Sequence, residues 1–316
     1  MPNTGRGRGP FNPPRGAAGG GEPRAPESGA SGGSGAGLTR LPLASNVARL
    51  VREQPAVAVH PGLVVTRLVR WAEHENEPRR WDFKVRDPKS RGEKDRKRDN
   101  LDIAVAAARN ASVTGLAREW LNRRQAWLAA TEKLGLSHRF RASTEWRLAI
   151  GLASAGPLET GIRLHHLYGV PVLPGSGLKG LALAAARDWL EVHEREYGAV
   201  FGTRDAAGLV DVLDAAPIPR DGRNFLEVDV MNPHYPRWYR GEPSVPPSDD
   251  QSPVPVFFLT VPLGTEFEFA LLCRRRTDEA RHALGRAVEW LRVGLTEMGA
   301  GAKTAAGYGY FTEIGP

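Results

Sequence analysis

The sequence contains one cysteine, Cys273, and only three methionines among its 316 residues. A single thiol cannot build a disulfide framework or a cysteine-rich zinc site, so small cross-linked proteins are excluded. No apolar run approaches the roughly 20 residues that a membrane-spanning helix needs, and the first residues lack the apolar segment of a secretory signal. These absences predict a soluble, cytoplasmic protein with no metal, cofactor or membrane partner.

Positive charge is concentrated in the N-terminal third of the chain. Residues 1–100 hold 19 Lys and Arg against 11 Asp and Glu, whereas the rest of the chain is almost balanced. Ten basic residues face four acidic ones within residues 79–98. Such a segment suits a phosphate backbone, although a solvated surface loop has the same composition. An RNA role for Arg96, Lys97 and Arg98 depends on charge alone.

Composition divides the chain into three parts. Residues 1–40 are rich in Gly, Pro and Arg and nearly free of large apolar side chains, so they are predicted to be a disordered tail. Residues 41–145 are predicted to be a mainly helical extension that carries the basic loop 79–98. Leu116, Trp120, Trp127 and Leu134 recur near helical spacing, which predicts that they form its buried face.

Residues 146–316 alternate between strand-like and helix-like patterns. Strands are predicted at 146–153, 209–213, 225–230, 254–261, 267–273 and 308–312, and helices at 178–197 and 278–298. The first of these helices is expected to bury Leu178, Leu181, Ala185 and Trp189. The order strand, helix, strands, helix, strand is typical of the ferredoxin-like (RRM-like) fold, so an α+β domain is predicted.

Two loops have features of anion-binding sites. Residues 299–311 form a glycine-rich loop after a helix, in which Gly301 frees the backbone while Lys303 and Thr304 add a cation and a hydroxyl. The order of residues and the absence of a following helix exclude a Walker A nucleotide loop, which leaves a polyphosphate backbone as the expected ligand. In residues 168–180, Ser176 is placed to cap a helix and Lys179 lies in its first turn.

A third loop, residues 229–241, mixes aromatic and basic side chains. Arg237 and Arg240 could bind phosphates while Trp238 stacks on a base, but the same aromatic residues could equally pack on the sheet or on a neighbouring subunit.

Four further features of the sequence are the segments 159–171, 173–180, 253–262 and 299–309. Together they resemble the RAMP superfamily of CRISPR effector proteins. Within it, Leu164–Gly169 and Asp229–Tyr235 are most similar to the backbone-capping subunit of the type III-B, or Cmr, complex.

The resemblance implies a ferredoxin-like RAMP domain that binds guide RNA near its 3′ end and leaves target RNA open as a second partner. It also implies contacts with an adjoining RAMP backbone subunit and with a small helical subunit. Ser176, Lys179, Gly301, Lys303 and Thr304 match motif positions expected near RNA. The implied role is non-catalytic, in antiviral RNA-guided interference.

Two other functions remain open from the residues alone. RAMP relatives include guide-processing ribonucleases that use a histidine, and His165 and His166 are adjacent here. Neighbouring residues on a strand point to opposite faces, so at most one could reach a given phosphate. Asp249 and Asp250 have no clear third partner for a metal-dependent reaction. The other alternative is an assembly subunit that binds only proteins.

Overall fold

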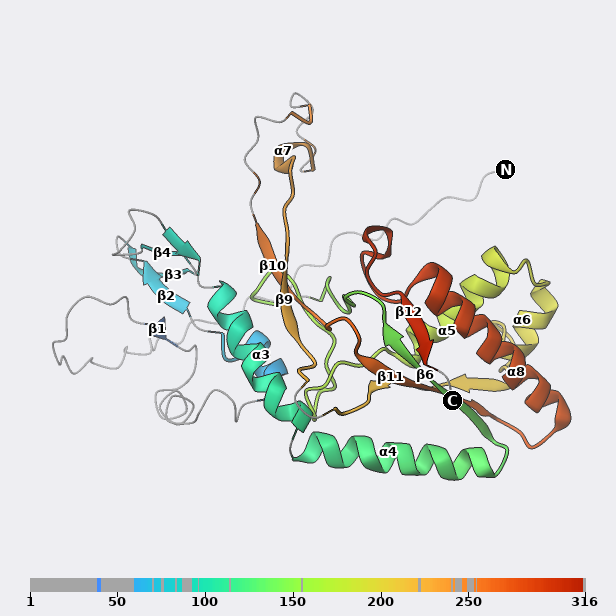
Figure 1. The fold of residues 1–316 in the computed structure, drawn as a ribbon. Coiled ribbons are helices and arrows are strands. Elements are labelled where there is room, and N and C mark those ends of the chain that lie inside the picture. The colour runs from blue at the N-terminus through green and yellow to red at the C-terminus, as the bar shows by residue number, and fades with distance from the viewer. Residues whose placement is uncertain are drawn as a thin grey trace, which may run out of the picture. The chain divides into compact units, whose positions relative to one another are not determined.

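An antiparallel sheet lies at the centre of the fold formed by the chain from residue 137 onward (Figure 1). Its strands follow the order β12-β6-β11-β7, and β8 pairs with β11. β6 pairs with β11 on one side and with β12 on the other. The strands are β6 (Ser137–Thr144), β7 (Val210–Val212), β8 (Ala216–Pro217), β11 (Glu266–Cys273) and β12 (Phe311–Ile314).

The structure is a computed structural model, and it describes only part of the chain. The predicted tail, residues 1–40, lies outside the described residues except for β1 (Thr39–Arg40). The described residues are 39–40, 60–69, 71–74, 77–82, 84–86, 93–95, 97–113, 115–154, 156–220, 223–239, 241, 246–248, 253 and 255–314.

One face of the sheet builds the main apolar core. Alternate residues of a strand point to opposite faces, so Phe267, Phe269 and Leu271 of β11 all lie on this side, fully buried. α5 and α8 pack against each other and cover this face. The helical segments here are α5 (Gly175–Ala184), the π-helical turn Ala185–Trp189, α6 (Glu194–Phe201), α8 (Asp278–Val293) and the π-helical turn Gly294–Met298.

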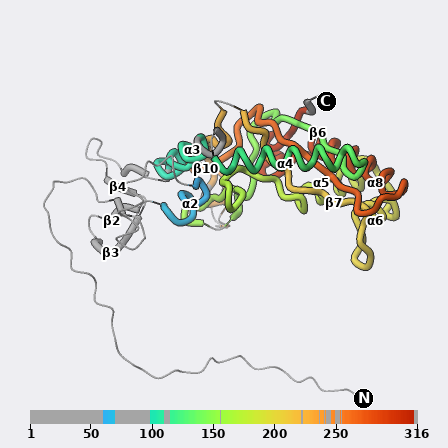
Figure 2. The backbone as a smooth tube through the Cα atoms, turned by 90° about the horizontal axis from the view of Figure 1, so that it is seen from below, coloured from blue at the N-terminus to red at the C-terminus, as the bar shows by residue number. Residues whose placement is uncertain are grey.

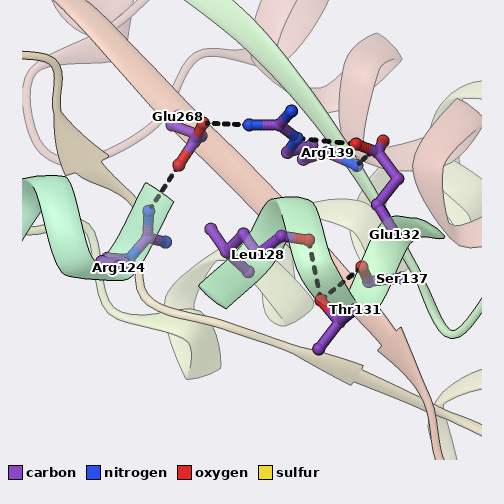
Figure 3. Close-up of polar contacts among 7 residues, drawn as sticks. All are labelled: Arg124, Leu128, Thr131, Glu132, Ser137, Arg139 and Glu268. Carbon is purple, nitrogen blue, oxygen red and sulfur yellow. Dashed lines mark hydrogen bonds and ion pairs between the residues drawn. The ribbon is translucent and has the colours of Figure 1, made fainter. Parts of the chain in front are cut away.

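The opposite face of the sheet is covered in part by α4 (Leu116–Lys133), which crosses the body in the view of Figure 2. Glu268 of β11 points to this side, with 1% of its side chain exposed. Arg124 of α4 and Arg139 of β6 both pair with it, at 3.2 and 3.3 Å (Figure 3). The buried Arg124–Glu268 pair therefore joins the sheet to a helix that precedes it in the sequence.

A two-stranded arm leaves the body beside this sheet (Figure 1). β9 (Glu227–Met231) pairs with β10 (Val256–Thr260), and the short helix α7 (Pro236–Tyr239) lies towards the outer end of the arm. A second apolar cluster, including Leu101, Leu226 and Leu259, packs α2 and α3 against the base of the arm. The remaining elements are α2 (Pro61–Thr66), α3 (Lys97–Val113), β2 (Trp71–His74), β3 (Glu77–Asp82), β4 (Lys84–Arg86) and β5 (Glu93–Asp95).

The α+β prediction is confirmed, and so are the expected positions of β7, β9, β10, β11 and α8. The strand predicted at 146–153 is wrong, because that segment makes only isolated bridges, from Leu148 to Val261 and from Ala149 to Ala302. β6 takes its place and begins at Ser137, upstream of the predicted boundary at residue 146. Short strands also occur between residues 79 and 95, within the segment 79–98 where a basic loop was expected.

Two predicted apolar faces differ from the structure. The helix expected at 178–197 breaks at the π-helical turn Ala185–Trp189, and 55% of Trp189 is exposed. A π turn adds a residue, which rotates later side chains away from the face that helical spacing assigns them. On α4 the buried residues are Ala117, Leu121 and Leu128, so Leu116, Trp127 and Leu134 are largely exposed.

Candidate nucleic-acid interface

The glycine-rich loop is closed on itself and fixed to the segment that follows β6. The amide of Ala300 donates to the Gly309 carbonyl at 2.8 Å, and the amides of Ala302 and Gly309 donate to Ala149 and Arg147 at 2.7 and 2.9 Å. Gly301 and Gly309 have φ values of 91° and 81°. A Cβ at either position would overlap a backbone carbonyl oxygen. These two glycines are therefore required by the packing of the loop, before any ligand is considered.

Lys303 lies over the base of the arm. It adopts a left-handed conformation with φ of 62°, and its Nζ is 3.9 Å from the Met231 sulfur. The same ammonium lies 6.0 Å from the ring centres of Phe258 and Tyr308. Thr304 follows at the start of a 3-10 turn, Thr304–Ala306, and is half-buried. The predicted cation of the loop thus has internal contacts with the arm.

A polar network also ties the loop to β9. The Tyr308 hydroxyl donates to Asp229 at 2.7 Å, and Arg147 pairs with Glu227 at 2.5 Å and with Asp229 at 3.3 Å. Burial, together with the hydrogen bond to Asp229, raises the pKa of Tyr308 to about 12. The phenol therefore stays protonated and keeps donating at physiological pH.

The start of α5 differs from the prediction. Pro174, not Ser176, is the N-cap residue, because the amide of Leu178 already bonds to the Pro174 carbonyl at 3.0 Å. Asp214 accepts from the amide of Gly175 at 2.7 Å and so supplies the capping oxygen from another loop. Ser176 is exposed in the first turn of the helix.

Lys179 also has an internal partner. Its Nζ donates to the Phe201 carbonyl at 2.5 Å, at the C-terminal end of α6. A cation is favourable there because the last carbonyls of a helix lack intrahelical partners. This bond uses one of three ammonium hydrogens.

The glycine-rich loop and the start of α5 meet in one open cleft of about 490 Å³. Gly301 lies on the loop side and Gly177 on the helix side. Of the predicted residues, Gly301 alone lines the cleft. Ser176 and Lys179 of α5, and Lys303 and Thr304 of the loop, are not among its lining residues. The lining residues are Ile150, Gly151, Ser154, Arg163, Leu173, Pro174, Gly177, Leu178, Leu181, Gly299, Ala300 and Gly301.

Arg163 is the charged residue of the cleft lining, and the sequence reading missed it. Its side chain is exposed and makes no ion pair or side-chain hydrogen bond to any residue that the structure describes. Its backbone bonds to Ile150 and Val172 on both sides, which fixes its position. Arg163 lies in the segment that carries the family resemblance, two residues before His165, and this position could have marked it as a candidate RNA-binding residue.

Those predicted aromatic and basic residues of the loop 229–241 that the structure describes lie on the arm. Arg237 and Trp238 lie in α7, and half of Trp238 is exposed. Arg240 lies outside the described residues, as do Asp249 and Asp250. The arm therefore presents an aromatic side chain away from the core, as stacking on a base would require.

His165 is packed among aromatic rings. Its ring centre lies 4.7 Å from those of Trp120 and Tyr168, and its Nδ1 accepts from the amide of Leu167 at 3.2 Å. The ring of His166 also stacks on that of His165, with 5.0 Å between the ring centres. Burial lowers the pKa of His165 below its usual value, and the neighbouring His166 and His60 act in the same direction. These contacts give His165 a packing role.

The lowered pKa of His165 predicts a pH dependence of stability. Below the usual histidine pKa near 6.5, the unfolded chain binds a proton that the folded chain excludes, so stability is lost as the pH falls. We expect His165→Gln to flatten this loss relative to the wild type. Thermal melts between pH 5 and pH 8 measure it, with His193→Gln as a control on an exposed cap. Parallel pH profiles for His165→Gln and the wild type would contradict the assignment.

The part of the chain that the structure describes contains neither a cluster of metal ligands nor a membrane-spanning helix. No three His, Cys, Asp or Glu side chains come together there as metal ligands. Among the same residues, no helix is both long enough and apolar enough to cross a bilayer.

Comparison with known proteins gives concordant matches. A model of the RAMP superfamily matches residues 139–312. The "CRISPR system Cmr subunit Cmr6" of Pyrococcus furiosus is 31% identical over 229 residues, covering 54% of this chain and 66% of that relative, just under two thirds of its length. A chain in a structure of the type III-B Cmr-beta complex bound to cognate target RNA is 22% identical, with a TM-score of 0.54. That match covers 69% of this chain and 71% of the other, and it shows the fold alone.

Proposed function

Because the chain belongs to the RAMP superfamily, we propose that it is a non-catalytic RNA-binding subunit of a type III-B CRISPR ribonucleoprotein. The observation that carries the proposal is the cleft in which the glycine-rich loop meets the start of α5, with Arg163 at its edge. An exposed guanidinium beside glycine backbone suits a phosphate of a passing RNA strand.

The strand order supports a ferredoxin-like domain. The first, second, third and fourth of its strands along the chain are β6, β7, β11 and β12. Across the sheet they lie in the order fourth, first, third, second. α5 follows the first strand and α8 follows the third, and both pack on one face. The other face is covered in part by α4 and its ion pairs with Glu268, so we assign RNA to the cleft and not to an open sheet.

The proposed place of the subunit is the end of the complex, where it caps the backbone near the guide 3′ end. The relative from Pyrococcus furiosus is named as a Cmr subunit, which supports assembly into a Cmr complex. The partners in the proposal are an adjoining RAMP backbone subunit and a small helical subunit. Trp238 and Arg237 on α7 are suited to contact guide or target RNA beyond the cleft.

The proposal assigns no catalysis to this chain. His165 is held by Trp120, Tyr168 and the amide of Leu167, which supports a structural role. Because Nδ1 accepts from that amide, the neutral ring carries its proton on Nε2 and has no free nitrogen to act as a general base.

The proposal is tested on the complex purified from the native host through a tagged chain. The wild type should retain short RNAs with a common repeat-derived 5′ tag and variable 3′ ends. Arg163→Ala should weaken rebinding of stripped guide RNA about tenfold, because a charge-assisted phosphate contact is removed. The slope of log affinity against log salt should become shallower by about 0.7, the value for one phosphate on a single strand.

The matched control is Arg195→Ala, an exposed arginine on α6 that does not line the cleft. It should leave affinity and salt slope unchanged. A wild-type complex without such RNA would overturn the proposal. Equal effects of Arg163→Ala and Arg195→Ala would show that the cleft is not the RNA-binding site.

A further inference from the structure

The cleft has the size and lining of a pocket for one nucleotide, and we propose that it holds a single unstacked nucleotide of the bound RNA strand. Its volume of about 490 Å³ lies within the range of about 300–1,000 Å³ that is usual for small-molecule pockets. The inference rests on the proposed function, since it names which part of the RNA enters the site.

The floor of the cleft is apolar. Ile150, Leu173, Leu178 and Ala300 line it, and each is at most 5% exposed. Leu181 is half-buried and adds an aliphatic side chain to the wall. A base has two apolar faces, so such a floor can cover one of them and remove it from water.

Two exposed glycines from different elements line the cleft, Gly177 of α5 and Gly301 of the glycine-rich loop. A Cβ at Gly177 would meet nothing within 4 Å, so no protein atom fills the space beside it. At Gly301 the Cβ position is closed by the Ala149 carbonyl oxygen, so this residue contributes backbone only. The cleft is therefore open to a ligand on the α5 side.

Arg163 is suited to the phosphate of the same nucleotide. The N-terminus of α5 is already capped by Asp214, so its charge is partly compensated and the guanidinium is the stronger anion partner. Ser154 is the other polar side chain of the lining. With so few polar groups to read base edges, the pocket would accept any base, as a subunit that binds guides of varying sequence requires.

The test compares two substitutions on one helix. Gly177→Trp fills the cleft, whereas Gly180→Trp places the same ring on α5 at an exposed position outside the lining. A Cβ meets nothing within 4 Å at either position, so neither change forces the helix apart. Chemical probing of the guide in the purified complex, with a reagent that modifies unpaired bases, then reports each nucleotide.

In the wild type and in Gly180→Trp, one nucleotide should be protected. In Gly177→Trp its reactivity should rise about tenfold, the factor expected when one base loses its packing surface. If the wild type carries guide RNA but both variants give the same probing pattern, the single-nucleotide pocket is wrong and the proposed function stands. If the wild type carries no RNA, the proposed function itself fails.

Two further results would also overturn the pocket. Loss of a protein subunit from Gly177→Trp, with unchanged probing, would assign the cleft to a protein segment. The second result concerns the binding of free nucleoside monophosphates. If they raise the melting temperature of the RNA-free wild type but not of Gly177→Trp, the pocket binds free nucleotides instead of a nucleotide in a strand.

Discussion

Replacing Glu268 by alanine should lower the free energy of unfolding by about 3–5 kcal/mol, the cost of removing one partner from a buried ion pair. Glu268 is 1% exposed, and Arg124, its partner on α4, is 12% exposed. Without the carboxylate, the Arg124 guanidinium would keep its bond to the Asp214 carbonyl at 2.6 Å but lose its larger counter-charge. Burial lowers the pKa of Arg124, and Glu268 opposes that shift more than Asp214 does, so the loss leaves much of the desolvation penalty uncompensated.

The same substitution should loosen α4 from the sheet. Arg139 would keep its 2.6 Å pair with Glu132 at the end of α4, but the link through the centre of the helix would be lost (Figure 3). Urea denaturation followed by tryptophan fluorescence measures both effects, because Trp120 and Trp127 lie on α4.

Two variants control this prediction. Glu289→Ala removes the carboxylate of an exposed pair with Arg286 and should cost no more than about 1 kcal/mol. The double variant Arg124→Met/Glu268→Leu replaces the buried pair by apolar side chains and should recover much of the loss. Equal destabilisation by Glu268→Ala and Glu289→Ala would show that the buried pair does not hold α4.

Sequence periodicity correctly predicts those elements that bury one regularly spaced set of apolar side chains. α8 buries residues at helical spacing, including Leu284, Val288 and Leu291, and β11 alternates Phe267, Phe269 and Leu271 into the core. In both elements the apolar period alone specifies the structure. The prediction therefore succeeded where one core face was sufficient.

β6 was missed because its second face is charged. It carries Arg139 and Arg141 on the side away from the main core, and Arg139 is matched by Glu268 and Glu132 from other elements. No local pattern shows that such partners will be present. The prediction that Trp189 is buried was wrong for another reason. The π-helical turn that moves it to the surface leaves no trace in the apolar spacing of the sequence.

The candidate site shows the same limit. The sequence located the glycine-rich loop and the start of α5, but the internal bonds of Lys179 and Lys303 depend on Phe201 and Met231, which lie far away in the chain. Asp214 caps α5 from 39 residues downstream, so Ser176 is not needed for that task. Arg163 lies in a segment that carries the family resemblance, but the fold is needed to place it beside the glycine-rich loop and the start of α5.

Gly309→Ala should destabilise the folded protein by about 2–4 kcal/mol and reduce guide binding at the same time. Gly309 has φ of 81°, which costs an alanine about 1–2 kcal/mol, and its new Cβ would overlap the Ala300 carbonyl oxygen. Ala300 must then move, and with it the hydrogen bond from its amide to the Gly309 carbonyl. Since Gly299, Ala300 and Gly301 line the cleft, the displacement changes the shape of the proposed RNA site.

Gly307→Ala separates the two causes of this effect. Gly307 lies in the same loop with φ of 85°, but a Cβ there meets nothing within 4 Å, so the variant has the backbone strain without the overlap. It should cost only about 1–2 kcal/mol and leave guide affinity unchanged. Thermal melts and rebinding of stripped guide RNA measure both quantities on the same preparations. If the two variants lose guide affinity equally, backbone strain alone would explain the loss, and the contact between Ala300 and Gly309 would not shape the cleft.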